Sequence, residues 1–282
     1  MDSTRGMVMR QVSVAALCAA LCLGAAPAVK AAPLLTMEYS IGALSRALQF
    51  MGDGSVRIAC DGSVLVACDG SVTPVANALA EVSGDGSVRL RTQITLFGDG
   101  SVRVGDGSVM PGQDALLLDA LSFSPNPFIE ALLGVTDFGA ASTFLVTFGG
   151  PLTLGTNAFT YDLTGSATLT DASGDGITIG AVAQFGLPNG LIAGVVDGLG
   201  VASTGGTLAA EGTFPLTPAS GSESCVGCAF QLLAFGFEAS GGGDQYAMSG
   251  RFDINPVSVP APAPLGLLAA GLVMLGLVRR RA

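Results

Sequence analysis

Hydrophobic and polar residues alternate through much of the C-terminal half of the chain. In residues 245–254 every second position is apolar or glycine, and the positions between them are mainly polar. The apolar set is Tyr246, Met248, Gly250, Phe252 and Ile254. A period of two predicts an antiparallel strand that buries one face. Residues 143–148 and 158–163 alternate in the same way and are predicted to form similar strands.

Two further segments, residues 177–185 and 229–239, are more continuously apolar. Such segments predict central strands that are buried on both faces. Residues 166–170 follow Gly165, and this order predicts a hairpin with the preceding strand.

The segments between the predicted strands are rich in glycine. Residues 173–176 and 240–244 predict turns, and residues 114–121 or 128–133 are predicted to contain one or two helical turns. Short strands separated by glycine-rich turns predict an all-β fold, specifically an antiparallel β-sandwich.

The N-terminal residues have the layout of a secretory signal peptide. Arg5 and Arg10 form a weakly basic region near the start of the chain, and residues 12–24 form a 13-residue apolar segment. Residues 29–31 end in the small residue Ala31, as a signal peptidase requires. The pattern predicts an N-terminal signal helix within residues 1–31 that is cleaved after Ala31. The alternative is an uncleaved N-terminal membrane helix.

A second apolar segment lies at the end of the chain. Its 14 residues, 265–278, follow a proline-rich stretch and precede Arg279, Arg280 and Arg281. A helix of this length spans about 21 Å, which is less than the roughly 30 Å of bilayer hydrocarbon. The segment therefore predicts a short transmembrane helix whose arginines reach the headgroups. The positive-inside rule places these arginines in the cytoplasm and the rest of the chain outside.

This C-terminal segment resembles the PEP-CTERM sorting signal, which consists of a Pro-x-Pro motif, a short apolar helix and a terminal arginine cluster. The motif residues are Pro260, Ala261 and Pro262, and the family usually has glutamate in the middle. The resemblance is confined to residues 256–282 and implies no activity. It implies cleavage near the motif by an exosortase, a membrane cysteine transpeptidase. Proteins with this signal occur in Gram-negative bacteria that make extracellular polysaccharide. The alternative is a simple tail anchor with a proline-rich hinge.

The terminal segments enclose a β-rich ectodomain, residues 32–255. With the terminal charges set aside, six basic residues remain against 21 acidic residues, a formal charge of about −15. Such a charge argues against binding to nucleic acid or to anionic lipid surfaces. It favours solubility and the binding of divalent cations.

Four cysteines lie in the ectodomain: Cys60, Cys68, Cys225 and Cys228. The periplasmic route favours disulfides, and of three possible pairings we expect the local one, Cys60–Cys68 and Cys225–Cys228. Two alternatives stay open. One is a pair of free or redox-active thiols at Cys225 and Cys228, and the other is a zinc site with four thiolate ligands. The wide gap between Cys60 and Cys68 fits zinc poorly.

The tetrapeptide Asp-Gly-Ser-Val occurs six times between residues 52 and 112. Its copies begin at Asp53, Asp61, Asp69, Asp85, Asp99 and Asp106. Their irregular spacing argues against a solenoid. Because Asp-Gly is typical of tight turns, each copy predicts one hairpin turn. Three interpretations stay open: tolerated insertions in loops, turns with weak cation affinity, and a dedicated Ca²⁺ module. One carboxylate and one hydroxyl per copy are few ligands for Ca²⁺.

Common catalytic groups are missing from the sequence. It has no histidine, and its one lysine, Lys30, lies in the signal peptide. Ser-His-Asp, Cys-His and Ser-Lys catalysis are therefore excluded. Two carboxylates would suffice for glycoside hydrolysis, and the candidates are Glu211, Glu223 and Glu238. With no tryptophan and three tyrosines, the chain has few aromatic faces for a sugar. We expect a non-catalytic protein without a cofactor or metal centre.

These features together predict an exported cell-surface or extracellular-matrix protein. It is expected to be held in the inner membrane until an exosortase processes it, and then to lie at the cell surface or outside the cell. The expected partners are the exosortase and the inner membrane, with exopolysaccharide as a further candidate and nucleic acid excluded. Two alternatives stay open: a polysaccharide- or Ca²⁺-binding module, and an unprocessed tail-anchored envelope protein.

Overall fold

The structure is a computed structural model that describes residues 33–60, 79–105, 111–154 and 158–257. These residues form strands and no helix, and the paired strands run antiparallel. The all-β, antiparallel part of the prediction is therefore confirmed, and the arrangement is consistent with a β-sandwich. Within the described ranges, no helix has the length and apolar composition that a membrane span requires.

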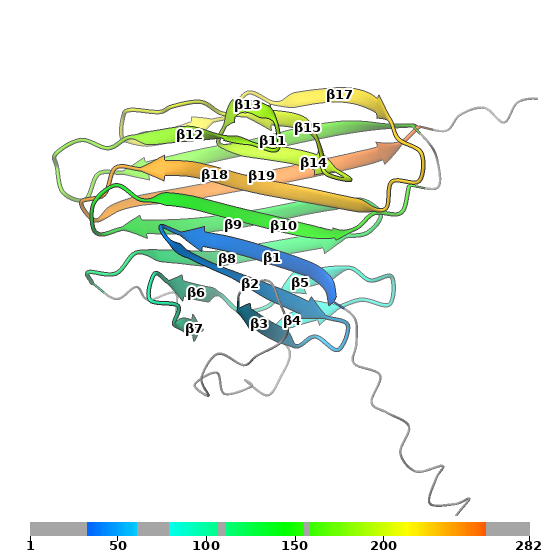
Figure 1. The fold of residues 1–282 in the computed structure, drawn as a ribbon, viewed down its shortest axis with the longest axis horizontal. Coiled ribbons are helices and arrows are strands. Elements are labelled where there is room, and N and C mark those ends of the chain that lie inside the picture. The colour runs from blue at the N-terminus through cyan, green and yellow to red at the C-terminus, as the bar shows by residue number, and fades with distance from the viewer. Residues whose placement is uncertain (1–32, 61–78, 106–110, 155–157, 258–282) are drawn as a thin grey trace, which may run out of the picture. The chain divides into compact units, whose positions relative to one another are not determined.

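Nine strands form the first sheet (Figure 1): β1 (Pro33–Ile41), β2 (Leu44–Met51), β3 (Val56–Cys60), β10 (Thr143–Pro151), β12 (Ile179–Gln184), β13 (Leu187–Gly190), β14 (Ile192–Val196), β15 (Leu199–Thr204) and β18 (Phe230–Ala239). Their order is β13-β12-β18-β10-β1-β2-β3. Strand β18 pairs along one side with both β12 and β14, and β15 extends the sheet beyond β14.

Ten strands form the second sheet: β4 (Ala80–Val82), β5 (Val88–Leu90), β6 (Ile94–Phe97), β7 (Val102–Val104), β8 (Ala115–Ser124), β9 (Phe128–Asp137), β11 (Ala158–Thr170), β16 (Gly212–Pro215), β17 (Ala219–Ser224) and β19 (Asp244–Pro256). Their order is β16-β11-β19-β9-β8-β5-β4. Strand β17 also pairs with β11, while β6 pairs with β8 and β7.

The inner faces of the two sheets share one hydrophobic core. The ring of Phe237 in β18 stacks on that of Phe144 in β10, with centroids 5.4 Å apart. The ring of Phe237 also lies 5.9 Å, centroid to centroid, from that of Tyr246 in β19. Because β18 and β19 belong to different sheets, these aromatic contacts join the two layers.

Strand β19 follows the predicted alternation. Tyr246, Met248, Gly250, Phe252 and Ile254 are all buried, whereas the residues between them are exposed or half-buried. The buried side chains lie on the inner face of the second sheet because successive residues of a strand point to opposite sides. The predicted strands at residues 143–148 and 229–239 are likewise confirmed as parts of β10 and β18.

The hairpin predicted around Gly165 is wrong. Residues 158–170 form the single strand β11, which pairs with β19 from Phe159–Pro256 through to Thr170–Gln245. Gly165 lies opposite Gly250 within this ladder. A glycine in a strand often marks a turn, but it also permits close approach of another backbone or side chain, and here the ladder continues through it.

Two other expectations are corrected. The helical turns predicted at residues 114–121 or 128–133 are instead strands β8 and β9, which pair with each other over most of their length. Residues 177–185 do contain a strand, β12, which pairs with β13 and β18. The prediction that it is buried on both faces is wrong, because it lies next to the edge strand β13 and four of its six residues are exposed or half-buried.

Candidate functional site

Three copies of the Asp-Gly-Ser-Val repeat form hairpin turns with the same geometry. The copies beginning at Asp53, Asp85 and Asp99 connect β2 to β3, β4 to β5, and β6 to β7. In each turn the Asp Oδ1 accepts a hydrogen bond from the backbone N–H of the serine two residues later, at 2.9, 2.9 and 2.8 Å. The hairpin prediction is confirmed for these copies. The copies at Asp61, Asp69 and Asp106 lie outside the described residues.

The aspartate carboxylates of these turns accept hydrogen bonds from the turns themselves. Hydrogen bonds from the following serine lower the pKa of Asp53, Asp85 and Asp99, because such bonds favour the charged carboxylate. The glycine after each aspartate has a positive φ, as Gly54 does at 79°, a conformation that glycine adopts without strain. The repeat therefore has a local structural role in these three turns.

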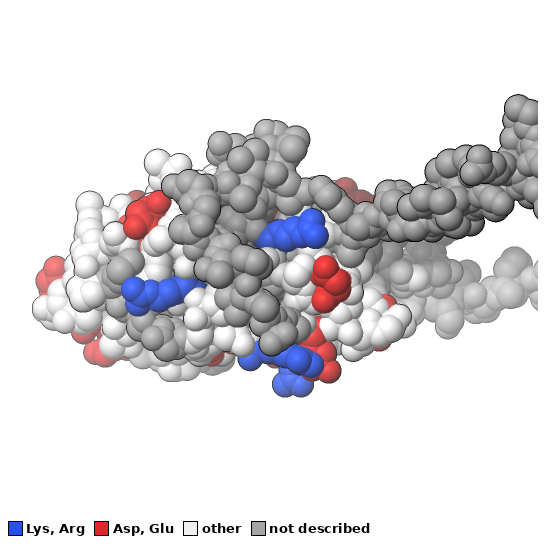
Figure 2. All heavy atoms as spheres, turned by 90° about the horizontal axis from the view of Figure 1, so that it is seen from below, with Lys and Arg blue, Asp and Glu red and all other residues white. Residues whose placement is uncertain are grey.

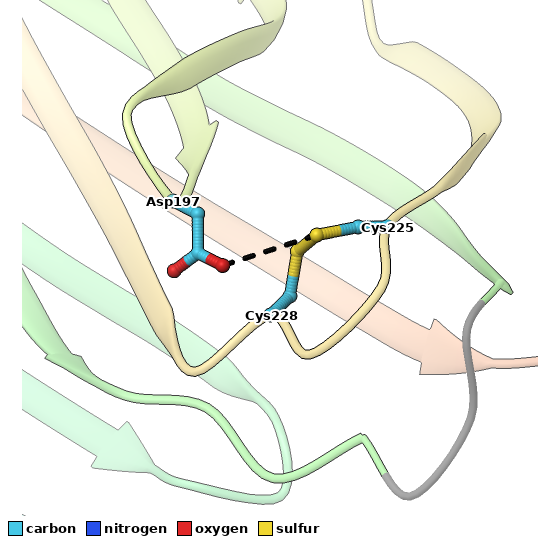
Figure 3. A group of neighbouring side chains, drawn as sticks. All are labelled: Asp197, Cys225 and Cys228. Carbon is cyan, nitrogen blue, oxygen red and sulfur yellow. Dashed lines mark hydrogen bonds between the residues drawn. A yellow bond between two sulfur atoms is a disulfide. The ribbon is translucent and has the colours of Figure 1, made fainter.

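Cys225 and Cys228 form a disulfide in the loop between β17 and β18 (Figure 3), with 5.7 Å between their Cα atoms. This is the local pairing expected for these two cysteines. The carboxylate of Asp197, in the β14–β15 turn, points at the disulfide, and its Oδ2 lies 3.8 Å from the Sγ of Cys225. The same carboxylate accepts the backbone N–H of Ala229 at 3.2 Å. The contacts join the β14–β15 turn to the loop that leads into β18.

The surroundings of this disulfide are those of a structural link. Strands flank the Cys225–Cys228 loop on both sides, whereas a thioredoxin-like redox motif requires a βαβ setting. A neighbouring carboxylate also disfavours formation of a thiolate, which is the reactive form of cysteine. Cys60 is the last residue of β3, and Cys68 lies outside the described residues.

The three glutamates considered for hydrolysis lie in different parts of the fold. Glu238 belongs to β18 in the first sheet, Glu223 belongs to β17 in the second, and Glu211 immediately precedes β16. Glu223 lies opposite Phe159 of β11, and Glu238 lies opposite Thr143 of β10. The sheet registers thus bring neither Glu223 nor Glu238 opposite another carboxylate.

Four aspartates form a row across four neighbouring strands of the second sheet. Asp137 ends β9 and Asp244 begins β19, and the two are directly opposite in the ladder. Asp114 immediately precedes β8, and Asp171 immediately follows β11, so each continues the ladder by one position. Asp175, in the turn after β11, adds a fifth carboxylate. We call these five residues the acidic end.

Hydrogen bonds hold the carboxylates of Asp244 and Asp171 in place. Asp244 is buried and accepts hydrogen bonds from the Ser240 hydroxyl at 2.6 Å and the Ala172 N–H at 3.3 Å. Asp171 accepts the N–H of Gly174 at 2.6 Å, and this bond lowers the pKa of its carboxyl group. Asp171 is therefore held in its charged form.

Asp137 is the most strongly perturbed carboxylate of the acidic end. Its side chain is 0% exposed. Its Oδ2 accepts the N–H of Ser142 at 3.1 Å, but its Oδ1 has no hydrogen-bond partner. Burial raises the pKa of Asp137 to about 6; the Asp114 carboxylate adds to this rise through its charge and by a hydrogen bond with the protonated form, while the Ser142 bond opposes it. A buried acceptor without a partner costs free energy, so this residue destabilises the fold when it is charged.

We expect Asp137→Asn to stabilise the protein at about pH 8 and to change its stability little at about pH 4, in buffer without divalent cations. The pKa of Asp137 is about 6 in the folded protein and near 4 in an unfolded chain. The folded state therefore holds this proton more tightly, and the wild type loses stability as pH rises from about 4 to 6. Asparagine has no charge to repel Asp114 and still accepts the Ser142 N–H.

The test is urea unfolding of both proteins at the two pH values with EDTA present. The wild-type values alone are insufficient because other carboxyls also titrate, so the difference between the two proteins is the relevant quantity. The phenol of Tyr246 faces the same end of the sheet. Burial raises its pKa above the ordinary value of 10, so it does not titrate between the two test pH values. An Asn variant that is no more stable than wild type at the higher pH would contradict the assignment.

The charges of the described residues are distributed unevenly along the chain. Five of the six described arginines lie in residues 46–103, and no lysine or arginine occurs between Arg103 and Arg251. Figure 2 shows arginines next to acidic side chains on the lower face of the molecule. Arg251 is paired with Glu130 and Asp253 on strands of the second sheet. All five residues of the acidic end belong to the stretch without basic residues.

The remaining sequence-predicted residues are not part of the described structure. They are the cleavage residue Ala31, the motif residues Pro260, Ala261 and Pro262, and the terminal arginines Arg279, Arg280 and Arg281. The acidic end, by contrast, was missed in the sequence. Its signal there is an aspartate beside the end of each of four strands within a stretch that contains no basic residue. Comparison of the chain with models of protein families and with curated proteins finds no match.

Proposed function

We propose that the protein is exported, sorted by an exosortase through its C-terminus, and left at the cell surface or in the extracellular matrix as a non-catalytic component. The observation that carries this proposal is the order of features in residues 256–282: the motif Pro260-Ala261-Pro262, the apolar residues 265–278, and three arginines. The apolar segment is short for a lasting bilayer span, so it suits a transient membrane stage.

The N-terminus supports export independently of the C-terminus. A basic start, an apolar segment at residues 12–24 and small residues up to Ala31 fit a cleaved signal helix. The Cys225–Cys228 disulfide fits an oxidising compartment, since such bonds are rare in the cytosol. In this proposal the C-terminal segment is a short transmembrane helix until processing, and the antiparallel sheets form a β-sandwich ectodomain.

The proposed partners follow from this route. The exosortase and the inner membrane contact the C-terminal segment before cleavage, and exopolysaccharide surrounds the ectodomain afterwards. The absence of histidine, and of lysine outside the signal peptide, leaves few groups for general acid–base catalysis. The sequence therefore supports a structural role better than an enzymatic one.

The test is mass spectrometry of the mature protein made in a Gram-negative host, with and without an exosortase. With the enzyme, we expect an N-terminus after Ala31 and a C-terminus near Pro262. Replacement of Arg279, Arg280 and Arg281 by glutamine is expected to abolish C-terminal cleavage, because the cationic tip holds the segment in its orientation.

Arg89→Gln serves as a matched control, because Arg89 is exposed on β5 and lies far from the C-terminal segment in the sequence. It is expected to leave processing unchanged. An intact C-terminal Ala282 in the wild-type protein made with the exosortase would refute sorting and leave an unprocessed tail-anchored protein. A reporter fusion that places the ectodomain in the cytoplasm would refute export itself.

A further inference from the structure

The acidic end concentrates negative charge without a basic neighbour in the sequence. Asp137 and Asp244 lie directly opposite each other in the β9–β19 ladder, and both are buried. Like charges at such positions destabilise a sheet, and a buried charge is costly unless it is paired. The sequence stretch that supplies them, between Arg103 and Arg251, contains no lysine or arginine.

Three carboxylates of the acidic end already converge. One oxygen each from Asp171, Asp175 and Asp244 lies within 4.8 Å of the other two. Oxygens that share one Ca²⁺ at about 2.3–2.6 Å are at most about 5.2 Å apart, so the spread fits a common ion. The hydroxyl of Ser173 bonds to Asp171 at 3.3 Å and also to Asp175, which places a further oxygen in the same group.

The second observation is the unpaired oxygen of Asp137. This side chain is 0% exposed, and its Oδ1 has no hydrogen-bond partner. Side chains of directly opposite residues point to the same side of a sheet, so Asp137 faces the same end of the core as Asp244. A fully buried acceptor without a donor needs a partner that the side chains around it do not supply, such as a cation or a water molecule.

We propose that the acidic end binds Ca²⁺ through the carboxylates of Asp171, Asp175 and Asp244, with the buried, unpaired Asp137 opposite Asp244 in the ladder. Oxygen ligands from carboxylates and a hydroxyl are typical of Ca²⁺. Thiophilic metals such as zinc prefer nitrogen and sulfur, which this group lacks. The bound ion would connect the turn after β11 to the start of β19, next to the end of β9, and so stabilise this end of the core.

The proposal extends the proposed function without depending on it. Ca²⁺ sites of extracellular modules bind with dissociation constants of roughly 0.1–1 mM, so an exported protein would be saturated only outside the cell. Failure of C-terminal processing would leave the Ca²⁺ site intact, and failure of Ca²⁺ binding would leave the sorting proposal intact.

The test is thermal unfolding of the full-length protein, followed by circular dichroism, in EDTA and in CaCl₂. A ligand that binds only the folded state raises Tm, and a site of this affinity at about 10 mM Ca²⁺ should raise it by about 3–10 °C. Asp175→Asn and Asp244→Asn are both expected to abolish most of this shift. Asp175 is exposed, so its variant is expected to fold even if the buried Asp244 variant does not.

Asp162→Asn is the matched control. Asp162 is an exposed aspartate of β11, the strand that Asp171 immediately follows, and it does not belong to the acidic end. It should keep the full shift with Ca²⁺. A wild-type Tm that does not change with Ca²⁺ would overturn the proposal. An equal shift in Asp175→Asn, Asp244→Asn and wild type would also overturn it, because the ion would then bind elsewhere, for example at the Asp-Gly-Ser-Val turns.

Discussion

Replacement of Gly165 by alanine is expected to lower the free energy of unfolding by about 3 kcal/mol, which is at the upper end for overpacking a core. A Cβ at this position would lie 2.6 Å from the backbone oxygen of Ser249 and would overlap the side chain of Ile192. The Ser249 carbonyl belongs to β19, which pairs with β11 along its length. The Ile192 contact is with the end of its side chain, but the Ser249 oxygen is backbone and cannot move away without disturbing the ladder.

This change is measured by thermal or urea unfolding, where about 3 kcal/mol corresponds to a fall in Tm of about 6–12 °C for a domain of this size. Gly206→Ala is the matched control. Nothing lies within 4 Å of a Cβ at Gly206, and its φ is not in the left-handed region. Because a permitted alanine also restricts the unfolded chain, this control should be neutral or slightly stabilising. Equal stability of the two variants would refute the close approach at Gly165.

The role of Gly165 shows why part of the fold could not be predicted from sequence. A period of two is a local property, so it identified β19 and its buried face correctly. The hairpin at Gly165 was wrong because the reason for this glycine is tertiary. Gly165 pairs with Gly250, and both lie beneath side chains of the first sheet. No local pattern distinguishes this requirement from that of a turn.

Strands β8 and β9 give a second example. The leucine-rich start of β8 (Ala115–Ser124) has good intrinsic helix propensity. Its register with β9, from Ala115–Thr136 to Ser124–Phe128, nevertheless makes it a strand. Tertiary pairing overrides propensity in such segments. The Asp-Gly-Ser turns, in contrast, are determined by bonds within a few residues, and the three described copies form as predicted.

The candidate site follows the same division. The Cys225–Cys228 link spans three positions of sequence, and its short spacing made the pairing predictable. The acidic end joins residues from Asp114 to Asp244 through the registers of four strands. Sequence alone shows that these aspartates exist and that no basic residue lies among them. It does not show that they share one end of one sheet.

The second large effect is expected for Phe235→Ala in β18. Phe235 is 0% exposed, and its ring meets that of Phe148 edge to face with centroids 6.2 Å apart. Across the core it covers Gly250, where an added Cβ would lie 2.8 Å from the ring. Truncation of a buried phenylalanine costs about 3–5 kcal/mol. Phe185→Ala, at a side chain that is 41% exposed, is the control and should cost much less.

The contact between Phe235 and Gly250 makes a sharper version of this experiment possible. Gly250→Ala alone should destabilise the wild type because its methyl group overlaps the ring. In the Phe235→Ala background the same substitution should cost less or even stabilise, since the methyl group then enters the space left by the ring. A double-mutant cycle measured by urea unfolding should therefore give a coupling of about 1–3 kcal/mol. Additive effects within about 0.5 kcal/mol would mean that the two sheets do not meet at this point.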